Sequence, residues 1–461
     1  MWAQLLFSTL SSLGASLTQG VFLSNYIILV GLGTTDVGYL FATSGLVNLF
    51  LAFPLGYLTD RVGRQALLRG GALFSLCSQA CFAAALQLRS TPLLYAAAAL
   101  NGVTAACTGP ALSASFADSV PTGDRTFTFT LLYSGSLAAG GAGPAAAAVF
   151  FWRQGNNWAL PTIVPVMHAG NAVGAVASFL LILIRDANAL GGESEGVLAR
   201  GGGAAKGSDS GSGGDGHLHR EGPLEEALLP AAEAAAGGAA APAAPAALPQ
   251  RLGLGHQTLR ICGFTLTVAH VPYLLFSSDF IIAVGAGMTV AYFPLFFSQQ
   301  EGLSPVALSL LWAAVPALIA GVGLVLLPIS KRFGRAPAAL FANTLGTGCL
   351  FSLWLALKLP VPAVCALYLV RSGAMNGSAA VQRGLLMDVV PKALRGRWSA
   401  MEALTGFTWT GSALLGGWLV QGGSYTASFF YTALIYCAAL IVFLPLLPLT
   451  RGERVDGGGG E

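Results

Sequence analysis

Long apolar segments separated by short polar turns dominate the chain. Each is long enough for the roughly 20 residues that a membrane-spanning helix needs. Six lie in the first half, near residues 8–31, 36–58, 66–87, 92–118, 127–152 and 160–185. Six lie in the second half, near 262–297, 305–329, 337–357, 361–388, 399–420 and 425–449. The pattern predicts an all-α integral membrane protein with 12 transmembrane helices.

Between the two halves the composition changes to Gly, Ala, Ser and Pro, which cannot bury a core. We therefore predict an N-terminal six-helix bundle over residues 1–186 and a disordered linker over 187–255. A C-terminal six-helix bundle follows over 256–450, and a disordered tail over 451–461.

The composition supports a membrane protein and excludes several other classes. The chain is 54% hydrophobic and 9% charged, against about 25% charged residues in a globular domain. A net charge of +3 gives no reason to expect nucleic acid. All seven cysteines lie in or beside apolar segments, so we expect no disulfide framework and no metal site. No ATP-binding loop, nucleophile elbow or zinc-protease helix occurs, and we expect a non-enzyme without a cofactor.

A charged turn occurs once in each half. Residues 60–64, Asp-Arg-Val-Gly-Arg, correspond to residues 331–335, Lys-Arg-Phe-Gly-Arg, at an offset of 271. Asp118, with Arg125 after it, corresponds to Asp388 and Arg395 at an offset of 270. Two motif pairs that agree within one residue indicate a duplication, a known architecture of secondary transporters.

Lys and Arg in the short loops predict the orientation, because they gather on the cytoplasmic side. One side carries Arg61, Arg64, Arg69, Arg125, Arg185, Lys331, Arg332, Arg335, Lys392, Arg395, Arg397, Arg451 and Arg454. The other side has Arg89, Arg153 and Lys358. We therefore expect both termini and the linker in the cytoplasm. This requires an even number of spans.

These features resemble the major facilitator superfamily. Its loop between the second and third helices reads Gly-x3-Asp-[Arg/Lys]-x-Gly-[Arg/Lys], which Gly56, Asp60, Arg61, Gly63 and Arg64 match. The second copy keeps Arg332, Gly334 and Arg335 but has Lys331 in place of the carboxylate. The resemblance implies two six-helix bundles that rock around a midplane site, with helices one, four, seven and ten lining the cavity.

The fifth predicted helix is similar to the Gly-Pro motif of the drug/proton antiporter branch. It contains Gly135, Gly140, Gly143 and Pro144, although its earlier glycines are spaced differently. Small residues also allow close helix packing with no further meaning. Both interpretations stay open at this point.

The two charged turns also suggest a latch. Arg64 is placed to reach Asp118, and Arg335 to reach Asp388, at one end of each bundle. Such pairs would hold the cytoplasmic side closed, and the resemblance implies the same role. The alternative is a snorkelling anchor, which explains the arginines but not the two aspartates.

Ionisable groups inside spans are costly and are candidate functional residues. We single out Asp279 as a proton-linked carboxylate, buried against Arg383, and Arg371 as a cation free to meet substrate. A structural ion pair is the alternative for Asp279 and Arg383. Further polar candidates on the lining helices, each of which could equally be an interhelical hydrogen bond, are Asn25, Asn101, Asn376 and Gln382.

The sequence thus predicts a monomeric secondary transporter in a lipid bilayer. It would move a small organic solute by alternating access with proton coupling, and the arginines favour an anionic solute. The alternative from another class is a non-transporting receptor, scaffold or lipid-handling protein on the same fold. Drug efflux and metabolite uptake both remain open.

Overall fold

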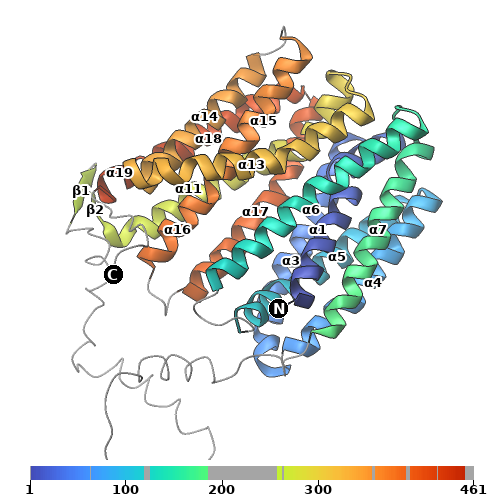
Figure 1. Ribbon diagram of the computed structural model, residues 1–461, viewed down its shortest axis with the longest axis horizontal. Helices are drawn as coiled ribbons and strands as arrows, with labels where there is room; N and C mark the ends of the chain where they lie inside the picture. The colour runs from blue at the N-terminus through green and yellow to red at the C-terminus, as the bar shows by residue number, and fades with distance from the viewer. Residues whose placement is uncertain are drawn as a thin grey trace, which may run out of the picture.

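The computed structural model describes residues 2–62, 64–118, 125–184, 257–261, 264–355, 359–390, 395–422 and 424–451. The predicted linker lies outside these residues, as does the predicted tail after Arg451. Helical rods run roughly side by side in two bundles, the first in blue to green and the second in yellow to red (Figure 1).

In the N-terminal half, the first rod is broken into two helices at Gly20. The helices are α1 (Trp2–Thr18), α2 (Val21–Leu29), α3 (Thr34–Val62), α4 (Arg64–Leu88), α5 (Thr91–Asp118), α6 (Arg125–Gln154) and α7 (Leu160–Leu183). Gly20 has φ +57°, a left-handed conformation that glycine adopts without a steric penalty.

In the C-terminal half, the first and fourth rods are broken. Its first elements are β1 (Thr258–Ile261), β2 (Phe264–Thr267), η2 (Val268–His270), α11 (Val271–Val290), α12 (Phe293–Leu295) and the π-helical turn η3 (Phe296–Gln300). The remaining helices are α13 (Pro305–Phe333), α14 (Arg335–Leu355), α15 (Val361–Gly377), α16 (Ala379–Val389), α17 (Arg395–Gly422), α18 (Tyr425–Phe443) and α19 (Leu446–Leu449).

The predicted membrane fold of six rods in each half is confirmed over the described residues. Of the helices described, 7 are long and apolar enough to cross a membrane by length and composition. The segment predicted as helix from residue 262 begins instead with a hairpin, in which Ile261 pairs with Phe264 and Thr258 with Thr267. β-Branched and aromatic side chains on either side of residues 262 and 263 favour this hairpin over a helix.

The packing of the helices repeats from one half to the other. In the N-terminal half α1 packs on α6 and α7, α5 on α3 and α4, and α4 on α7. In the C-terminal half α11 packs on α17 and α18, α15 on α13 and α14, and α14 on α18. Each helix pair of the first half has its counterpart at the same place in the second, so the duplication predicted from two short motifs extends to the whole fold.

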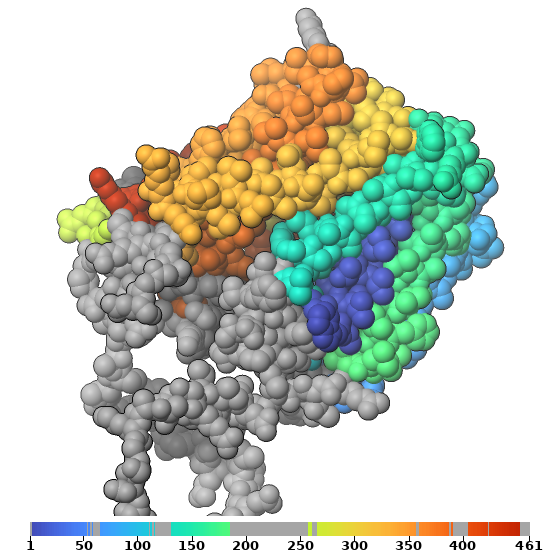
Figure 2. Space-filling model, in the orientation of Figure 1, coloured from blue at the N-terminus to red at the C-terminus, as the bar shows by residue number. Residues whose placement is uncertain are grey.

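The halves meet along two seams. Helix α3 packs against α17, and α6 packs against α13; the second seam runs between the teal and yellow helices of the space-filling view (Figure 2). We call the end of the rods that carries the α13–α14 turn the motif end, and the end that carries residues 155–159 and 301–304 the far end. The main hydrophobic core draws on both halves near the far end.

Candidate functional site

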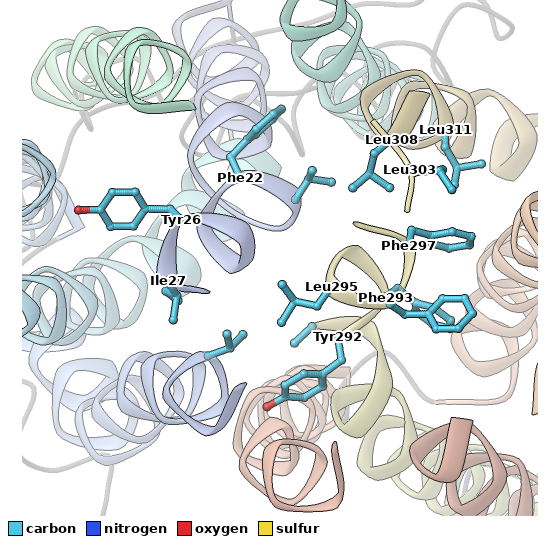
Figure 3. Packing of buried hydrophobic residues seen from close by; sticks show 14 of the residues in the cluster. Phe22, Tyr26, Ile27, Tyr292, Phe293, Leu295, Phe297, Leu303, Leu308 and Leu311 are labelled. Carbon is cyan, nitrogen blue, oxygen red and sulfur yellow. The ribbon is translucent and has the colours of Figure 1, made fainter. Parts of the chain in front are cut away.

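A seal of buried side chains from both halves occupies the far end. Helix α2, which carries Phe22, Tyr26 and Ile27, packs against α12 of the segment from Tyr292 to Phe297, with the Tyr26 ring turned away from that segment (Figure 3). All of the side chains drawn belong to one core cluster. Aromatic rings dominate the C-terminal side of the seal: Phe293 stacks on Phe429 at 4.8 Å between ring centroids. Such packing excludes water from this end of the molecule.

Among the residues that the structure describes, three hydrogen bonds join the halves across this seal. The Ser24 hydroxyl donates to the Ala291 carbonyl at 3.2 Å. The Trp158 indole donates to the Leu303 carbonyl at 2.9 Å, and the Val306 amide donates to Asn156 Oδ1 at 3.0 Å. The loops of one half are therefore fastened directly to the loops of the other.

Tyr292 lies at the centre of the seal, in the turn that separates α11 from α12. It is fully buried, and its hydroxyl donates to the Ala413 carbonyl at 2.6 Å. Three glycines surround the ring and hydroxyl, because a Cβ on Gly38, Gly416 or Gly417 would come within 3.0 Å of Tyr292. Gly38 belongs to the N-terminal half and Gly416 and Gly417 to the C-terminal half, so both halves form the socket that Tyr292 fills.

Small residues continue both seams away from the seal. A Cβ on Gly45 of α3 would overlap the Thr410 side chain of α17, and one on Gly141 of α6 would lie 3.1 Å from the Ala313 carbonyl of α13. Within the N-terminal half, a Cβ on Gly143 would overlap Ser16 of α1. Small residues allow this close approach of helix backbones.

The antiporter-like residues of α6 are explained in part by this packing. Gly135 faces Thr9, whereas a Cβ on Gly140 would have no neighbour within 4 Å. Pro144 lies inside the helix. Close packing accounts for Gly143 without any reference to proton exchange, and the antiporter branch is not established.

Arg371 lies inside the C-terminal bundle with aromatic rings around its guanidinium. It is 4% exposed, and Nη2 donates to the Tyr436 hydroxyl at 3.0 Å. Its Cζ lies 5.1 Å from the centre of the Phe293 ring and 6.0 Å from that of Tyr436. These distances are within the range of cation–π attraction.

The expectation that Arg371 is free to meet substrate is wrong for this conformation. Val364, Tyr368 and Arg371 follow one another at helical spacing on the buried face of α15. The guanidinium therefore points into the bundle, and its Nε atom is buried without a hydrogen-bond partner.

We predicted that Asp279 and Arg383 form a buried pair. The predicted burial is wrong for Arg383, which is exposed. On α16 the buried positions are Val381 and Leu385, and Arg383 lies between them on the opposite side of the helix. Asp279 is half-buried on α11, and α11 packs against α16. Proton linkage through Asp279 stays a prediction.

A buried polar cluster marks the break between α15 and α16. The Ser378 hydroxyl donates to Asn343 Oδ1 at 2.9 Å, and Gln382 Nε2 donates to Ser378 Oγ at 3.1 Å. Asn343 Nδ2 and Gln382 Oε1 are buried without partners. Gln382 was among the predicted candidates; Asn343 and Ser378 were not.

The other predicted asparagines make local bonds. Asn25 is buried and donates to the Val21 carbonyl of its own helix at 2.8 Å. Asn376 is exposed and donates to the Ser372 carbonyl at 2.9 Å. Asn101 is exposed on α5 and donates to Ser44 Oγ of α3 at 3.3 Å. Asn101 and Asn376 are thus the two predicted asparagines with exposed side chains.

Much of the predicted latch lies outside the described side chains. The latch residues whose side chains are not described are Gly56, Asp60, Arg61, Gly63, Arg64, Asp118 and Asp388. In the second copy, Gly334 ends α13 with φ +100°, which explains the glycine of the motif. Arg332 is exposed with its Cζ 5.4 Å from the Phe333 ring. Arg335 Nη1 would lie 3.3 Å from a Cβ on Gly384, one helical turn before Asp388.

Two further features border the site. Glu301 follows η3 at the far end, and burial raises the pKa of its carboxyl above 4.5. A groove of about 500 Å³ between α11, α17 and α18 is lined by Met288, Leu415, Trp418, Leu419, Tyr431, Leu434 and Ile435. Because Trp418, Tyr431 and Leu434 are exposed, this groove suits lipid chains at the outer surface and lies apart from the polar residues.

Sequence reasoning missed Tyr292, Phe293 and Tyr436, which enclose or fasten the site. Each is an aromatic residue within an apolar segment, and nothing in the sequence separates such residues from ordinary core aromatics. The break at Tyr292 is marked by Pro294 two residues later, which was the one available signal.

Comparison with known proteins identifies the family. The sequence matches the profile of the Major Facilitator Superfamily over residues 5–401, whereas no curated protein sequence matches it. Among solved structures, a D-xylose-proton symporter is similar with TM-score 0.65, 14% identity and 98% of each chain covered.

Two other solved structures share this fold. The nucleoside transporter NupG has TM-score 0.62 and 12% identity over 97% of this chain and 99% of its own. A bacterial homologue of the iron transporter ferroportin, in an inward-facing state, has TM-score 0.60 and 14% identity over 97% and 98%. With the seams, the repeated packing and the charged turns, the profile match shows that this chain belongs to the major facilitator superfamily and is a multi-pass membrane transporter, not an enzyme.

Proposed function

We propose that the protein is a secondary transporter that carries a small organic solute by alternating access. The observation that carries the proposal is the far-end seal. Its hydrogen bonds and the Tyr292 socket are shared between the halves, so rocking of one half against the other opens that end. A seal of this construction has little use in a receptor or scaffold that never opens.

The basic residues indicate which side of the membrane the seal faces. Lys331, Arg332 and Arg335 lie at the motif end, and basic residues favour the cytoplasmic side. We infer that the motif end, the termini and the linker are cytoplasmic. The closed far end then faces away from the cytoplasm, so in this conformation solute neither enters nor leaves on that side.

Proton coupling is part of the proposal and depends on Asp279. A half-buried carboxylate on a lining helix is a candidate proton carrier. Uptake into proteoliposomes by the monomeric protein should therefore follow an imposed pH gradient, and Asp279→Asn should uncouple it. Uptake that ignores the gradient removes the proton from the mechanism and leaves alternating access standing.

A disulfide across the seal tests alternating access itself. In a background without the native cysteines, an Asn156→Cys/Val306→Cys pair joins two segments already linked by a 3.0 Å hydrogen bond. Oxidation should stop transport, and reduction should restore it. The matched control is Gln87→Cys/His168→Cys, whose side chains meet at 3.0 Å within the N-terminal half.

The control cross-link should leave transport intact, because it does not join the halves. Full transport through the oxidised Asn156→Cys/Val306→Cys protein contradicts alternating access at this end. Absence of solute movement in both redox states would instead favour a non-transporting role.

A further inference from the structure

Arg371 is a buried cation with no carboxylate beside it among the described residues. Its guanidinium contacts the Tyr436 hydroxyl and the rings of Phe293 and Tyr436, and Tyr368 and Cys349 lie close enough to interact with its charge. None of these carries a negative charge, and Nε has no hydrogen-bond partner at all. The guanidinium therefore holds an unused donor and an uncompensated charge inside the bundle.

Such an arrangement is costly in a membrane protein. Arginines within spans normally pair with acids or carbonyl groups, and a buried donor without an acceptor loses its hydration with nothing in return. A hydrophobic residue of similar length would fill this space without that cost. The arginine at this position is best explained by a partner that is bound only for part of the cycle.

The position of Phe293 indicates in which conformation that partner is absent. Phe293 follows the break at Ala291 and Tyr292 and packs on Phe429 and Tyr368 within the far-end seal. Its ring lies over the guanidinium in the closed seal. Because a carboxylate binds guanidinium more strongly than an aromatic face does, an anion that reached Arg371 would displace this contact.

We propose that Arg371 recognises the carboxylate of an organic monoanion. When the far end closes, the Phe293 ring replaces that carboxylate against the guanidinium. One uncompensated cation matches one negative charge, and the surrounding rings of Phe293, Tyr368 and Tyr436 suit an apolar body. Closing the far end lowers the affinity for the anion, because Phe293 and the anion compete for one guanidinium. The inference rests on the proposed transport function and specifies its substrate class.

The test compares carboxylates with amides of the same shape. Benzoate and benzamide, and cyclohexanecarboxylate with its amide, are titrated calorimetrically into the full-length protein in nanodiscs. Wild type should bind the carboxylates at least about tenfold more tightly than the amides. Arg371→Gln should abolish this ratio, and Arg371→Lys should retain part of it through its charge.

Phe293→Leu supplies a gain of affinity that a misfolded variant cannot imitate. It removes the competing ring and should tighten carboxylate binding about fivefold without affecting the amides. Phe296→Leu is the matched control, because Phe296 lies in the same segment and packs on Phe429 but does not contact Arg371. It should leave the carboxylate-to-amide ratio unchanged.

Equal affinity for carboxylates and amides in wild type overturns the inference, as does an equal effect of Phe293→Leu and Phe296→Leu. Uptake of the same solutes into proteoliposomes separates this result from the transport proposal. Carboxylates carried equally well by wild type and Arg371→Gln leave transport standing and refute the anion site. Carboxylates that bind through Arg371 but never cross the membrane leave the anion site standing and refute the transport proposal.

Discussion

The two halves share one helix order and one set of packing partners, yet their fourth helices differ. Helix α5 runs without a break from Thr91 to Asp118, whereas its counterpart is divided at Ser378 into α15 and α16. Asn101 and Arg371 lie 270 residues apart, the offset that also relates Asp118 to Asp388. The same position thus carries an exposed amide in one half and a buried guanidinium in the other.

The halves also differ in their buried polar groups. Buried polar atoms without partners among the described membrane helices belong to Gln4 and Asn171 in the first half, and to Ser309, Asn343, Arg371 and Gln382 in the second. The second half therefore holds more polar groups with unused hydrogen-bonding capacity on its central helices. We infer that the C-terminal half recognises the solute and the N-terminal half serves mainly as the frame against which it rocks.

The largest expected effect comes from comparing two buried tyrosines, one from each half. Tyr292→Ala and Tyr26→Ala each delete a fully buried ring and should each cost about 3–5 kcal/mol of stability. The Tyr292 hydroxyl lies against Gly38 of the other half, whereas the Tyr26 hydroxyl donates to Ala85 within its own half. Tyr292→Ala should therefore slow oxidation of the Asn156→Cys/Val306→Cys pair several-fold. If Tyr26→Ala slowed this oxidation equally, the result would contradict the division of work between the two halves.

The next effect concerns the break in the fourth helix of the second half. Ser378→Ala removes the link between Asn343 and Gln382 and should cost about 1–3 kcal/mol, because buried amides are left unpaired. Its counterpart Thr108 donates only to the Thr104 carbonyl of its own helix. Thr108→Val should cost less than about 0.5 kcal/mol. Thermal unfolding in detergent measures both, and similar losses would mean that the break has no special role.

A smaller effect is expected at the exposed member of the Asn101–Arg371 pair. Asn101→Ala loses one hydrogen bond of 3.3 Å to Ser44, worth about 0.5–1.5 kcal/mol. The apparent KM for any transported solute should rise up to about tenfold. Since the charge at Arg371 is untouched, the ratio between carboxylates and amides should stay constant. A change in that ratio would give the N-terminal half a part in anion recognition.

The smallest effect is a pH dependence in the far-end seal. Burial raises the pKa of Glu301, so the folded protein holds this proton more tightly than the unfolded chain does. The stabilising contribution of the protonated carboxyl is present at acid pH and is lost as the pH rises from about 4.5 through the raised pKa. The N-terminal counterpart at the 271-residue offset is Val30, which does not titrate.

Glu301→Gln should flatten this dependence, with a shift in thermal midpoint on the order of 1 °C at neutral pH. Melting curves from pH 4 to pH 8 for wild type and variant provide the measurement. A wild-type slope that survives the substitution would assign the pH dependence to another group.

The sequence by itself determined the spans, the duplication and the family. Apolar runs of membrane length are read directly from composition, and short motifs such as Gly334 and Arg335 repeat because the turns they form repeat. Gly334 could be understood in advance, because its positive φ is a local property of the chain.

Only the tertiary structure decided how the candidate side chains are used. Arg371 and Arg383 are both arginines on the same span, yet one is buried under Phe293 and the other is exposed. That outcome depends on which face of α15 or α16 meets its neighbours, and on the break at Ser378 that separates the two helices. Contacts between residues 78 positions apart, such as Phe293 and Arg371, arise from helix packing, which local periodicity does not encode.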